Sequence, residues 1–344
     1  MNRFLLLLLI AVVGSFPADA AEPESCNADG ALTKIRIGLE WFLNPDHLPL
    51  VIALKHGFFR DFGLDVELVE PADHWEAEKE ILEGRLDVAV TEPLHLAQDA
   101  AKGADVLGFS RFLHTDGGVI YRKSSGISRP SDMCGKTISY PGSPGPGGPA
   151  IIQTMVEADG GDCDIDSYGK YNGGFYHVDA LESGKADVAT LVFWNFEIPE
   201  AKARGMDDAA FFSLKDWGVP DFCQLVLFTT PQRFEQQKDD LRKLVLAMRK
   251  ATGVIHQQPD VARETYYSYV KEKNGGEDAA ENETQKAVMD ATMTATLPAF
   301  PNDNSMANSY YARLMSWLIK TKQVEEDAAT KAPVSKYWTN EVSW

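Results

Sequence analysis

The chain has 344 residues, a formal net charge of -18 and 44% hydrophobic residues, and its pI is about 4.8. The length allows two ordinary domains, and the hydrophobic fraction is high enough for a full core rather than a disordered chain. Because an acidic surface repels a phosphate backbone and no basic patch interrupts it, we expect no nucleic-acid partner.

The N-terminus carries the pattern of a secretory signal peptide. Arg3 supplies a positive start, residues 4–13 form an apolar run, and small residues stand at Ala18 and Ala20, the two positions that a signal peptidase requires. The apolar run is too short to span a bilayer. We therefore predict a signal peptide over residues 1–20 and a mature protein that is exported to the periplasm, soluble and monomeric. An N-terminal membrane anchor is the alternative.

Strand and helix patterns alternate at the start of the mature chain. Residues 34–39 are rich in Ile and predict a strand, residues 48–59 predict a helix, and residues 64–69 predict a second strand. This β-α-β order implies parallel pairing with a right-handed crossover. The alternation continues with a helix at 76–83, a strand at 87–91, a helix at 94–102, and strands at 106–109 and 119–122.

One hexapeptide occurs twice, as Gly-Arg-Leu-Asp-Val-Ala at residues 84–89 and as Gly-Lys-Ala-Asp-Val-Ala at residues 184–189. Each copy follows a short charged run with helical character, and each predicts a helix, a tight glycine turn and a buried strand. Two similar α/β units suggest two lobes, and a cleft between lobes is a common place for a small ligand. Coincidence is the alternative, because the motif is short.

A polar segment at residues 123–130 is interpreted as the first crossing into a second lobe. The elements predicted there are strands at 136–140 and 187–192 and helices at 149–157, 179–183 and 197–204. A strand at 225–228 should carry the chain back to the first lobe.

Helical patterns follow at residues 239–255, 261–269, 283–294 and 306–320. We expect these helices to pack on the first lobe. Lobe I is then residues 21–124 plus 229–344, and lobe II is residues 125–228. A separate C-terminal helical domain is the alternative.

Four cysteines remain after removal of the signal peptide, namely Cys26, Cys134, Cys163 and Cys223. In an oxidising compartment an even number permits disulfides, and two bridges can form in three pairings. We favour Cys134 with Cys163, since both fall in one predicted lobe. A zinc site is not expected, because the sequence has no Cys-x-x-Cys pair.

Four segments follow predicted strands and should converge on the cleft, because ligands of open α/β sheets bind beyond the carboxyl ends of the strands. In the first segment, residues 40–47, Trp41 offers a flat face for stacking. Asn44, Asp46 and His47 follow at a predicted helix start and are further candidates. A capped turn with a buried aromatic residue is the alternative.

The second segment is a loop of prolines and glycines at residues 140–149, between a strand and a helix. Its candidate residues are Tyr140, Gly142 and Ser143. Glycines let the backbone approach a ligand closely, and free N–H groups at the helix start favour a carbonyl, phosphate or carboxylate group. The loop matches neither the Walker A pattern nor Gly-x-Gly-x-x-Gly, so we do not expect nucleotide binding.

The third segment, residues 171–177, combines aromatic residues with two glycines, and Phe175 is its candidate contact. A tight turn with exposed aromatics is the alternative. Glu92 is a further candidate, because it directly follows the strand of the first hexapeptide copy.

The fourth segment, residues 193–197, ends the strand of the second copy. Its Trp194, Asn195 and Glu197 bring together an indole, an amide and a carboxylate, which suits a flat heterocycle with amino groups. Glu197 could also complement a helix dipole. No catalytic arrangement is convincing, since the histidines are scattered and Ser143 lacks the Gly-x-Ser-x-Gly context of a hydrolase. We therefore expect a binding protein with no cofactor and no metal.

Taken together, these segments resemble the NMT1/THI5-like family, which holds periplasmic binding proteins of ABC importers and pyrimidine synthases of thiamine biosynthesis. The resemblance rests on residues 41–47, 57–59 with 63–67, 140–143, 174–175 with 180–184, and 193–197. It implies an α/β protein with the type II periplasmic-binding fold, in which two α/β lobes are joined by two crossing strands with a ligand cleft between them.

Within this family the chain is similar to binding proteins for thiamine pyrimidine precursors such as formylaminopyrimidine. In those proteins aromatic residues sandwich the pyrimidine while an Asn and a Glu bond its edge. The positions that the resemblance implies are Trp41, Asn44, Tyr140, Trp194, Asn195 and Glu197. It also implies an ABC permease as the membrane partner.

The rival within the family is a pyridoxal-phosphate-dependent pyrimidine synthase, which the predicted signal peptide disfavours. Relatives that bind riboflavin or a sulfonate are further alternatives. The candidate loops hold Asp46, Glu92 and Glu197, and these acidic residues favour a neutral or cationic heterocycle over an anion.

Overall fold

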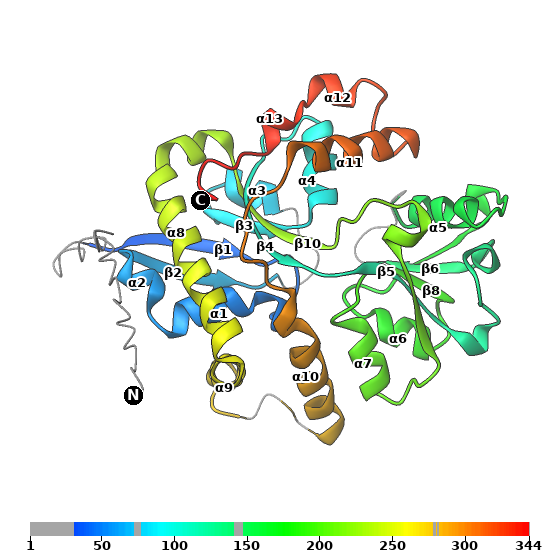
Figure 1. The fold of residues 1–344 in the computed structure, drawn as a ribbon, viewed down its shortest axis with the longest axis horizontal. Helices are drawn as coiled ribbons and strands as arrows, with labels where there is room; N and C mark the ends of the chain where they lie inside the picture. Colours follow the sequence, from blue (N-terminus) through cyan, green and yellow to red (C-terminus); the bar gives the residue numbers. More distant parts are fainter. Residues whose placement is uncertain (1–30, 72–76, 141–146, 278–279, 281, 344) are drawn as a thin grey trace, which may run out of the picture.

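The computed structural model describes residues 31–71, 77–140, 147–277, 280 and 282–343. The chain forms two lobes side by side, each built on a five-stranded sheet with helices around it (Figure 1). The first sheet has the order β2-β1-β3-β10-β4 and the second has the order β7-β6-β8-β5-β9. The predicted signal peptide lies outside the described residues.

Four strands of the first sheet, β1 to β4, run in the same direction, because β1 pairs in parallel with both β2 and β3, and β10 lies antiparallel between β3 and β4. Ile35 and Ile37 of β1 are buried on one face of the sheet, whereas Lys34 on the other face is exposed. The strands are β1 (Thr33–Gly38), β2 (Leu64–Val69), β3 (Val88–Thr91), β4 (Leu107–His114) and β10 (Gln224–Thr229).

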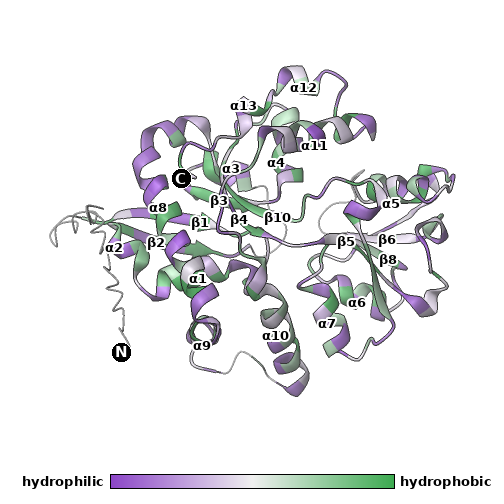
Figure 2. Cartoon of the chain, viewed as in Figure 1, coloured by the Kyte–Doolittle hydropathy of each residue, from purple (hydrophilic) through white to green (hydrophobic). Residues whose placement is uncertain are grey.

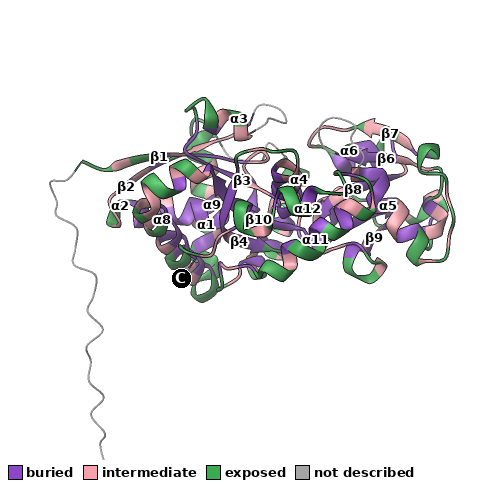
Figure 3. Cartoon of the chain, turned by 90° about the horizontal axis from the view of Figure 1, so that it is seen from above, coloured by how far each residue is buried: buried purple, intermediate pink, exposed green. Residues whose placement is uncertain are grey.

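The second sheet repeats this plan. Here β6 pairs in parallel with β7 and β8, and β5 lies antiparallel between β8 and β9. Its strands are β5 (Gly117–Arg122), β6 (Thr137–Tyr140), β7 (Gly169–Asn172), β8 (Val188–Phe193) and β9 (Ala209–Ser213). The strands are mostly buried, apart from the edge strand β7, and the exposed residues lie mainly on the surrounding helices and loops (Figure 3).

The helices between the strands follow the sequence prediction closely. They are α1 (Leu48–Lys55), α2 (Phe58–Asp61), α3 (Ala77–Leu82), α4 (Pro93–Ala101), α5 (Gly147–Ala158), α6 (His177–Glu182) and α7 (Glu197–Ala203). The single helix predicted over residues 48–59 is two helices, because Gly57 adopts a left-handed φ of 74° that ends α1. Apolar residues of these helices belong to two buried hydrophobic clusters, and Figure 2 marks them in green along the helices.

Two strands, β7 and β9, were not predicted. The sequence of β7 is Gly-Lys-Tyr-Asn and that of β9 is Ala-Ala-Phe-Phe-Ser. Neither carries an apolar alternation long enough to stand out. Both are edge strands, so pairing with β6 or β5 determines their extended conformation.

The chain passes between the sheets at two places. The first passage lies between His114 of β4 and Gly117 of β5, and the second lies between Ser213 of β9 and Gln224 of β10. The first crossing predicted at residues 123–130 is therefore too late, since β5 already pairs within the second sheet. Strand β10 begins at Gln224, inside the predicted lobe II, but it belongs to the first sheet. Strand pairing favours lobe boundaries near residues 115 and 223, and the division into lobes stays a proposal.

The C-terminal helices pack on the rest of the molecule. They are α8 (Pro231–Gln257), α9 (Pro259–Lys273), α10 (Glu283–Thr296), α11 (Asn308–Lys320), α12 (Ala328–Lys331) and α13 (Val334–Tyr337). Helices α8 and α9 lie against α1, and α11 lies against α4, all within the first lobe. Helix α10 differs, because it packs against α7 of the second lobe (Figure 1). No helix of the described residues is long and apolar enough to cross a membrane.

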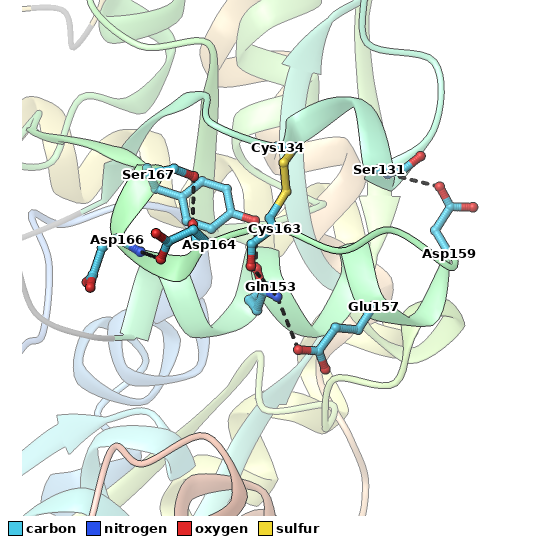
Figure 4. Close-up of a disulfide and its surroundings, with 10 residues drawn as sticks. Ser131, Cys134, Gln153, Glu157, Asp159, Cys163, Asp164, Asp166 and Ser167 are labelled. Atoms are coloured by element: carbon cyan, nitrogen blue, oxygen red, sulfur yellow. Dashed lines mark hydrogen bonds between the residues drawn. A yellow bond between two sulfur atoms is a disulfide. The ribbon is translucent and has the colours of Figure 1, made fainter.

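A disulfide joins Cys134 and Cys163, as favoured from the sequence (Figure 4). It closes a segment that contains β6 and α5, and the Cα atoms of the two cysteines are 5.8 Å apart. Cys223 is a buried free thiol, and Cys26 lies outside the described residues. Nearby, Ser131 donates its backbone N–H to Asp159 at 2.9 Å, so the cross-linked region is also tied by hydrogen bonds.

Candidate functional site

A cavity lies between the two lobes at the ends of β1, β3 and β8. It contains about 350 Å³ of space not filled by atoms, including the part open to solvent. The residues that line it are Glu40, Trp41, Asn44, Asp46, Glu92, Leu191, Phe193, Phe196 and Glu197. Five of the predicted site residues are among them, and they come from both lobes.

The turn after β1 is built as a capped helix start. Asn44 caps the 3-10 turn Pro45–His47, because its Oδ1 accepts from the backbone N–H of Asp46 at 2.8 Å. Its Nδ2 donates to the carbonyl of Phe42 at 3.1 Å. The capping alternative is therefore realised for Asn44, which fixes the turn at the wall of the cavity.

His47 is fully buried behind this wall. Its Nδ1 accepts from the backbone N–H of Asn44 at 3.2 Å, and its Nε2 lies 3.1 Å from Glu40 Oε1. Because Nδ1 acts as an acceptor, the tautomer with a proton on Nε2 fits this arrangement and donates to Glu40. His47 thus supports the cavity through Glu40 rather than lining it.

Asp46 places a buried carboxylate at the cavity. Its Oδ1 accepts from Asn195 Nδ2 at 2.5 Å, a bond that runs between the lobes. Burial raises the pKa of Asp46 to about 6, and the nearby His47 and the bond from Asn195 oppose that rise. At neutral pH the group is mainly ionised and can accept a hydrogen bond from a ligand.

Glu197 begins α7 and is buried. Its Oε2 accepts from the backbone N–H of Phe193 at 3.0 Å. Burial, with a contribution from Glu200, raises the pKa of Glu197 well above its usual value. A ligand that supplies donors would compensate for this cost of burial.

The neighbours of Glu197 in the fourth segment point to different places. Trp194 is 45% exposed and is not among the residues that line the cavity. Asn195 is fully buried and bonds to Asp46 and to Thr296. Trp194 therefore does not line the cavity. Asn195 does not line it either, but it is bonded to Asp46, which does.

Glu92 stands at the N-cap position of α4 and lines the cavity opposite the second lobe. Its Oε2 is 3.0 Å from His95 Nδ1, and this pairing helps to raise the pKa of His95 against the effect of burial. Glu92 is thus a carboxylate that already has a counter-charge within the same lobe.

Aromatic side chains meet across the lobes beside the cavity. The rings of Trp41 and Phe175 have centroids 4.4 Å apart, and Phe42 stacks on Tyr176 with a centroid distance of 6.3 Å. Phe196 also lies against Phe42. Phe175, the candidate of the third segment, packs on Trp41 but is not among the residues that line the cavity.

The second segment is described only in part. Tyr140 ends β6 and is 3% exposed, and burial raises its pKa. Its hydroxyl has no hydrogen-bond partner among the described residues. Tyr140 is not in the lining of the cavity, and the predicted residues Gly142 and Ser143 lie outside the described residues.

Four lining residues were not selected from the sequence. Glu40, Phe193 and Phe196 lie inside candidate segments, so their position after a strand is a signal that could have identified them. Leu191 has no such signal. It lies in a β-bulge, where two residues of β8 face Val119 alone, and it takes a left-handed φ of 59°. This strained conformation places Leu191 in the cavity wall.

The cavity is acidic and partly aromatic. Its described lining holds four carboxylates and three aromatic rings, and it holds no lysine or arginine. Among the described residues no group of His, Cys, Asp and Glu side chains could hold a metal ion. Such a lining favours a flat ligand with hydrogen-bond donors or positive charge.

The two sheets, their strand orders and the cavity between them define the type II periplasmic-binding fold. The model of the NMT1/THI5-like family matches residues 44–262, and the chain belongs to this family. Both the fold class and the family resemblance are therefore confirmed.

Curated relatives fall into two kinds. A formylaminopyrimidine-binding protein of Halalkalibacterium halodurans is 28% identical over 258 residues, which are 75% of this chain and 75% of the relative. A 4-amino-5-hydroxymethyl-2-methylpyrimidine phosphate synthase of Legionella pneumophila is 26% identical over 236 residues, or 67% of this chain and 72% of the relative.

Among solved structures, the alkanesulfonate-binding protein SsuA of Xanthomonas axonopodis bound to MOPS superposes with a TM-score of 0.66. The match covers 90% of this chain and 99% of that chain, with 13% identity. This likeness concerns the fold.

Proposed function

We propose that the protein is an exported substrate-binding protein of an ABC importer. It captures a small aromatic heterocycle, a thiamine pyrimidine precursor of the formylaminopyrimidine or hydroxymethylpyrimidine type, by closing its lobes. It then delivers the ligand to a permease, and it works as a monomer. The observation that carries this proposal is the cavity between the lobes, where aromatic rings and carboxylates from both sides face one space.

The chemistry of the lining supports a flat ligand with amino groups. Trp41, Phe193 and Phe196 offer ring faces and edges for stacking. Asp46 and Glu197 offer carboxylate oxygens that accept from ring or exocyclic N–H groups. The relative from H. halodurans, named as a formylaminopyrimidine-binding protein, supports the same ligand class.

The charge of the cavity argues against an anionic ligand. A sulfonate would meet the carboxylates of Glu40, Asp46 and Glu92, and no lysine or arginine stands among the described lining residues to balance it. Like charges at short range in a partly buried site are strongly unfavourable. A sulfonate is therefore a weaker candidate, although the fold is shared with a sulfonate-binding protein.

An enzyme of the synthase type is the second candidate, because synthases are among the relatives. Their cofactor, pyridoxal phosphate, brings a phosphate group and forms its covalent link to proteins through a lysine. The described lining of the cavity offers neither a lysine for that link nor a basic residue for the phosphate. These residues do not fit the cofactor, which favours the binding protein.

Calorimetric titration tests the proposal. The mature protein is titrated with formylaminopyrimidine, hydroxymethylpyrimidine, thiamine, riboflavin and an alkanesulfonate. We expect saturable binding of a pyrimidine and none of the sulfonate. Binding of none of the three thiamine-related compounds contradicts the ligand class, and formation of product with added pyridoxal phosphate supports the enzyme instead.

A matched pair of tryptophan variants ties the ligand to the cavity. Trp41→Ala removes a lining indole and should weaken pyrimidine binding by about 1.5 kcal/mol, roughly tenfold. Trp194→Ala removes an exposed indole outside the lining and should leave the affinity unchanged. Equal losses in both variants would mean that the ligand is held between the two indoles, as the family resemblance implies.

Export is proposed from the pattern of residues 1–20. The N-terminus of the mature protein, determined by mass spectrometry after expression in a Gram-negative host, should lie at Ala21. Recovery of the chain with residues 1–20 still attached contradicts cleavage at this site.

A further inference from the structure

Asn195 stands where the two lobes meet. It follows β8 and precedes α7 in the second lobe, and its side chain is fully buried. Its Nδ2 donates to Asp46 Oδ1 at 2.5 Å and to Thr296 Oγ1 at 2.7 Å. Asp46 lies in the turn between β1 and α1, and Thr296 ends α10, so both acceptors belong to elements outside the second sheet.

The hydrogen-bond capacity of this amide is the key point. A primary amide has two N–H donors, and both are used by Asp46 and Thr296. Its Oδ1 is buried without a partner among the described residues. The orientation follows from Asp46, because an ionised carboxylate only accepts hydrogen bonds. Asn195 therefore has no free donor for a ligand, and it is not among the residues that line the cavity.

Asp46 has a different position, because it both lines the cavity and holds the amide of Asn195. Thr296 Oγ1 is 3.5 Å from the same Oδ1 of Asp46, so three side chains meet at one point of the lobe interface. The two bonds from Asn195 can exist only while the lobes are together. Separation of the lobes would expose a carboxylate, an amide and a hydroxyl to water.

We propose that Asn195 is a positioning residue that latches the closed lobes and orients Asp46 toward the ligand. This role rests on the proposed binding function. In it Asn195 affects ligand binding through Asp46 and through closure, without touching the ligand. The bonds from Asn195 add to the stability of the closed state only, and ligand affinity scales with the population of that state. Asn195 thereby links closure to the carboxylate that the ligand meets.

Other contacts also cross the interface, so the latch works with them. Trp317 Nε1 of α11 donates to Thr154 Oγ1 of α5 at 3.1 Å, and Trp41 packs on Phe175. Neither contact involves Asn195, Asp46 or Thr296, the three latch residues. Loss of the latch should therefore increase opening without separating the lobes fully.

Closure is measured first without any ligand. Spin labels on the two lobes report the inter-lobe distance by pulsed electron resonance, and small-angle X-ray scattering reports the radius of gyration. Asn195→Ala should raise the open fraction about tenfold or more, since two hydrogen bonds are lost, one of them to a charged group. Thr296→Val should raise it less, and the exposed Asn302→Ala is the control.

A swap of donor and acceptor separates the latch from direct ligand contact. Asn195→Asp alone sets two carboxylates against each other and should open the lobes. The double variant Asp46→Asn with Asn195→Asp restores a donor and an acceptor at the same point, so closure should return. The pyrimidine affinity should not return, because the cavity has lost its carboxylate at position 46.

The outcomes distinguish this proposal from the proposed function. An unchanged distance distribution in Asn195→Ala and in Thr296→Val overturns the latch, whatever the ligand. Full recovery of affinity in the double variant also overturns it, because Asp46 would then have no role of its own. Normal latch behaviour with no binding of any tested compound leaves the latch supported and overturns the ligand class instead.

Discussion

The two copies of the hexapeptide form the same local structure in the two lobes (Figure 1). In the first, Asp87 accepts from the backbone N–H of Arg36 in β1 at 2.8 Å, and its own N–H donates back to the carbonyl of Arg36 at 2.9 Å. In the second, Asp187 makes the same pair of bonds with Thr137 of β6, each at 2.9 Å. Each aspartate thus fixes the strand after it beside a parallel neighbour, β1 in the first sheet and β6 in the second.

The two copies differ in the side chains that surround these shared hydrogen bonds. Asp87 also pairs with the side chains of Arg36 and Arg233, whereas the second copy has an uncharged threonine at the matching position. The strand of the first copy is followed by Glu92, and that of the second is followed by Asn195 and Glu197. The comparison teaches that the repeat sets the backbone and that the residues after each strand supply the chemistry.

The largest expected effect separates the two aspartates. Asp87→Ala leaves two arginines and a backbone N–H without their acceptor and should lower the free energy of unfolding by about 3 kcal/mol. Asp187→Ala removes one backbone interaction and should cost about 1 kcal/mol. Urea unfolding monitored by circular dichroism measures both. Equal losses would mean that the pairing of Asp87 with the two arginines contributes nothing to the free energy of unfolding.

The same aspartate predicts a pH dependence. Although burial opposes it, hydrogen bonding to Arg36 lowers the pKa of Asp87 below its usual 3.8. The stabilisation is then complete above the unfolded pKa near 3.8 and is lost as the pH falls through the lower folded value. The difference in stability between the wild type and Asp87→Asn should therefore be constant above pH ~5 and shrink below pH ~4.

A second test uses the disulfide, which has no counterpart in the first lobe. Cys134 and Cys163 enclose β6 and α5, whereas the corresponding β1-α1-β2 unit, residues 33–69, contains no cysteine. Replacing both cysteines by serine should lower the free energy of unfolding by about 3 kcal/mol, given their separation of 29 residues. Reducing agent should lower the stability of the wild type equally and that of the variant not at all.

A third test compares the carboxylates that end the two strands. Donors of the bound ligand favour the ionised form of Glu197, which has no basic side chain bonded to it among the described residues. Glu197→Gln removes this charged acceptor and should weaken pyrimidine binding by about 1.5–3 kcal/mol. Glu92→Gln should weaken it by about 1 kcal/mol or less, because Glu92 already pairs with His95. Calorimetry gives both values, and exposed Glu264→Gln is the control. The reverse order would identify Glu92 as the main acceptor.

The smallest effect tests the turns. Gly84 has a φ of 70° and Gly184 a φ of 68°, and neither has an atom within 4 Å of an added Cβ. Alanine at either position should lower the free energy of unfolding by about 1 kcal/mol through backbone strain alone. The two variants should match within about 0.5 kcal/mol. A clear difference would show that the copies are less alike than their hydrogen bonds suggest.

Local sequence predicted most of the fold because its elements carry their own signals. The glycine turns, the buried strands and the prolines that begin helices are visible within a few residues. Edge strands β7 and β9 depend on their neighbours, and the position of the first crossing depends on which sheet β5 joins. Those are long-range choices that a local pattern does not contain.

The same division applies to the candidate site. Trp41, Asp46, Glu92 and Glu197 follow strands, so the topology alone brings them to one edge. Thr296 comes from a helix far along the chain, and only tertiary packing brings it to Asp46. The bulge at Leu191 arises from a mismatch between two strands. Trp194 and Asn195 are neighbours in sequence with opposite surroundings, which a strand-end rule does not separate.

The bulge has a consequence for how this protein can evolve. Leu191 holds a left-handed conformation that glycine, and to a lesser degree asparagine, adopts at lower cost. Substitution by glycine would enlarge the recess for the guest molecule while relieving the main chain. A change of selectivity at this position therefore does not have to sacrifice folding, and a lineage could shift to bulkier nutrients there without first acquiring compensating mutations.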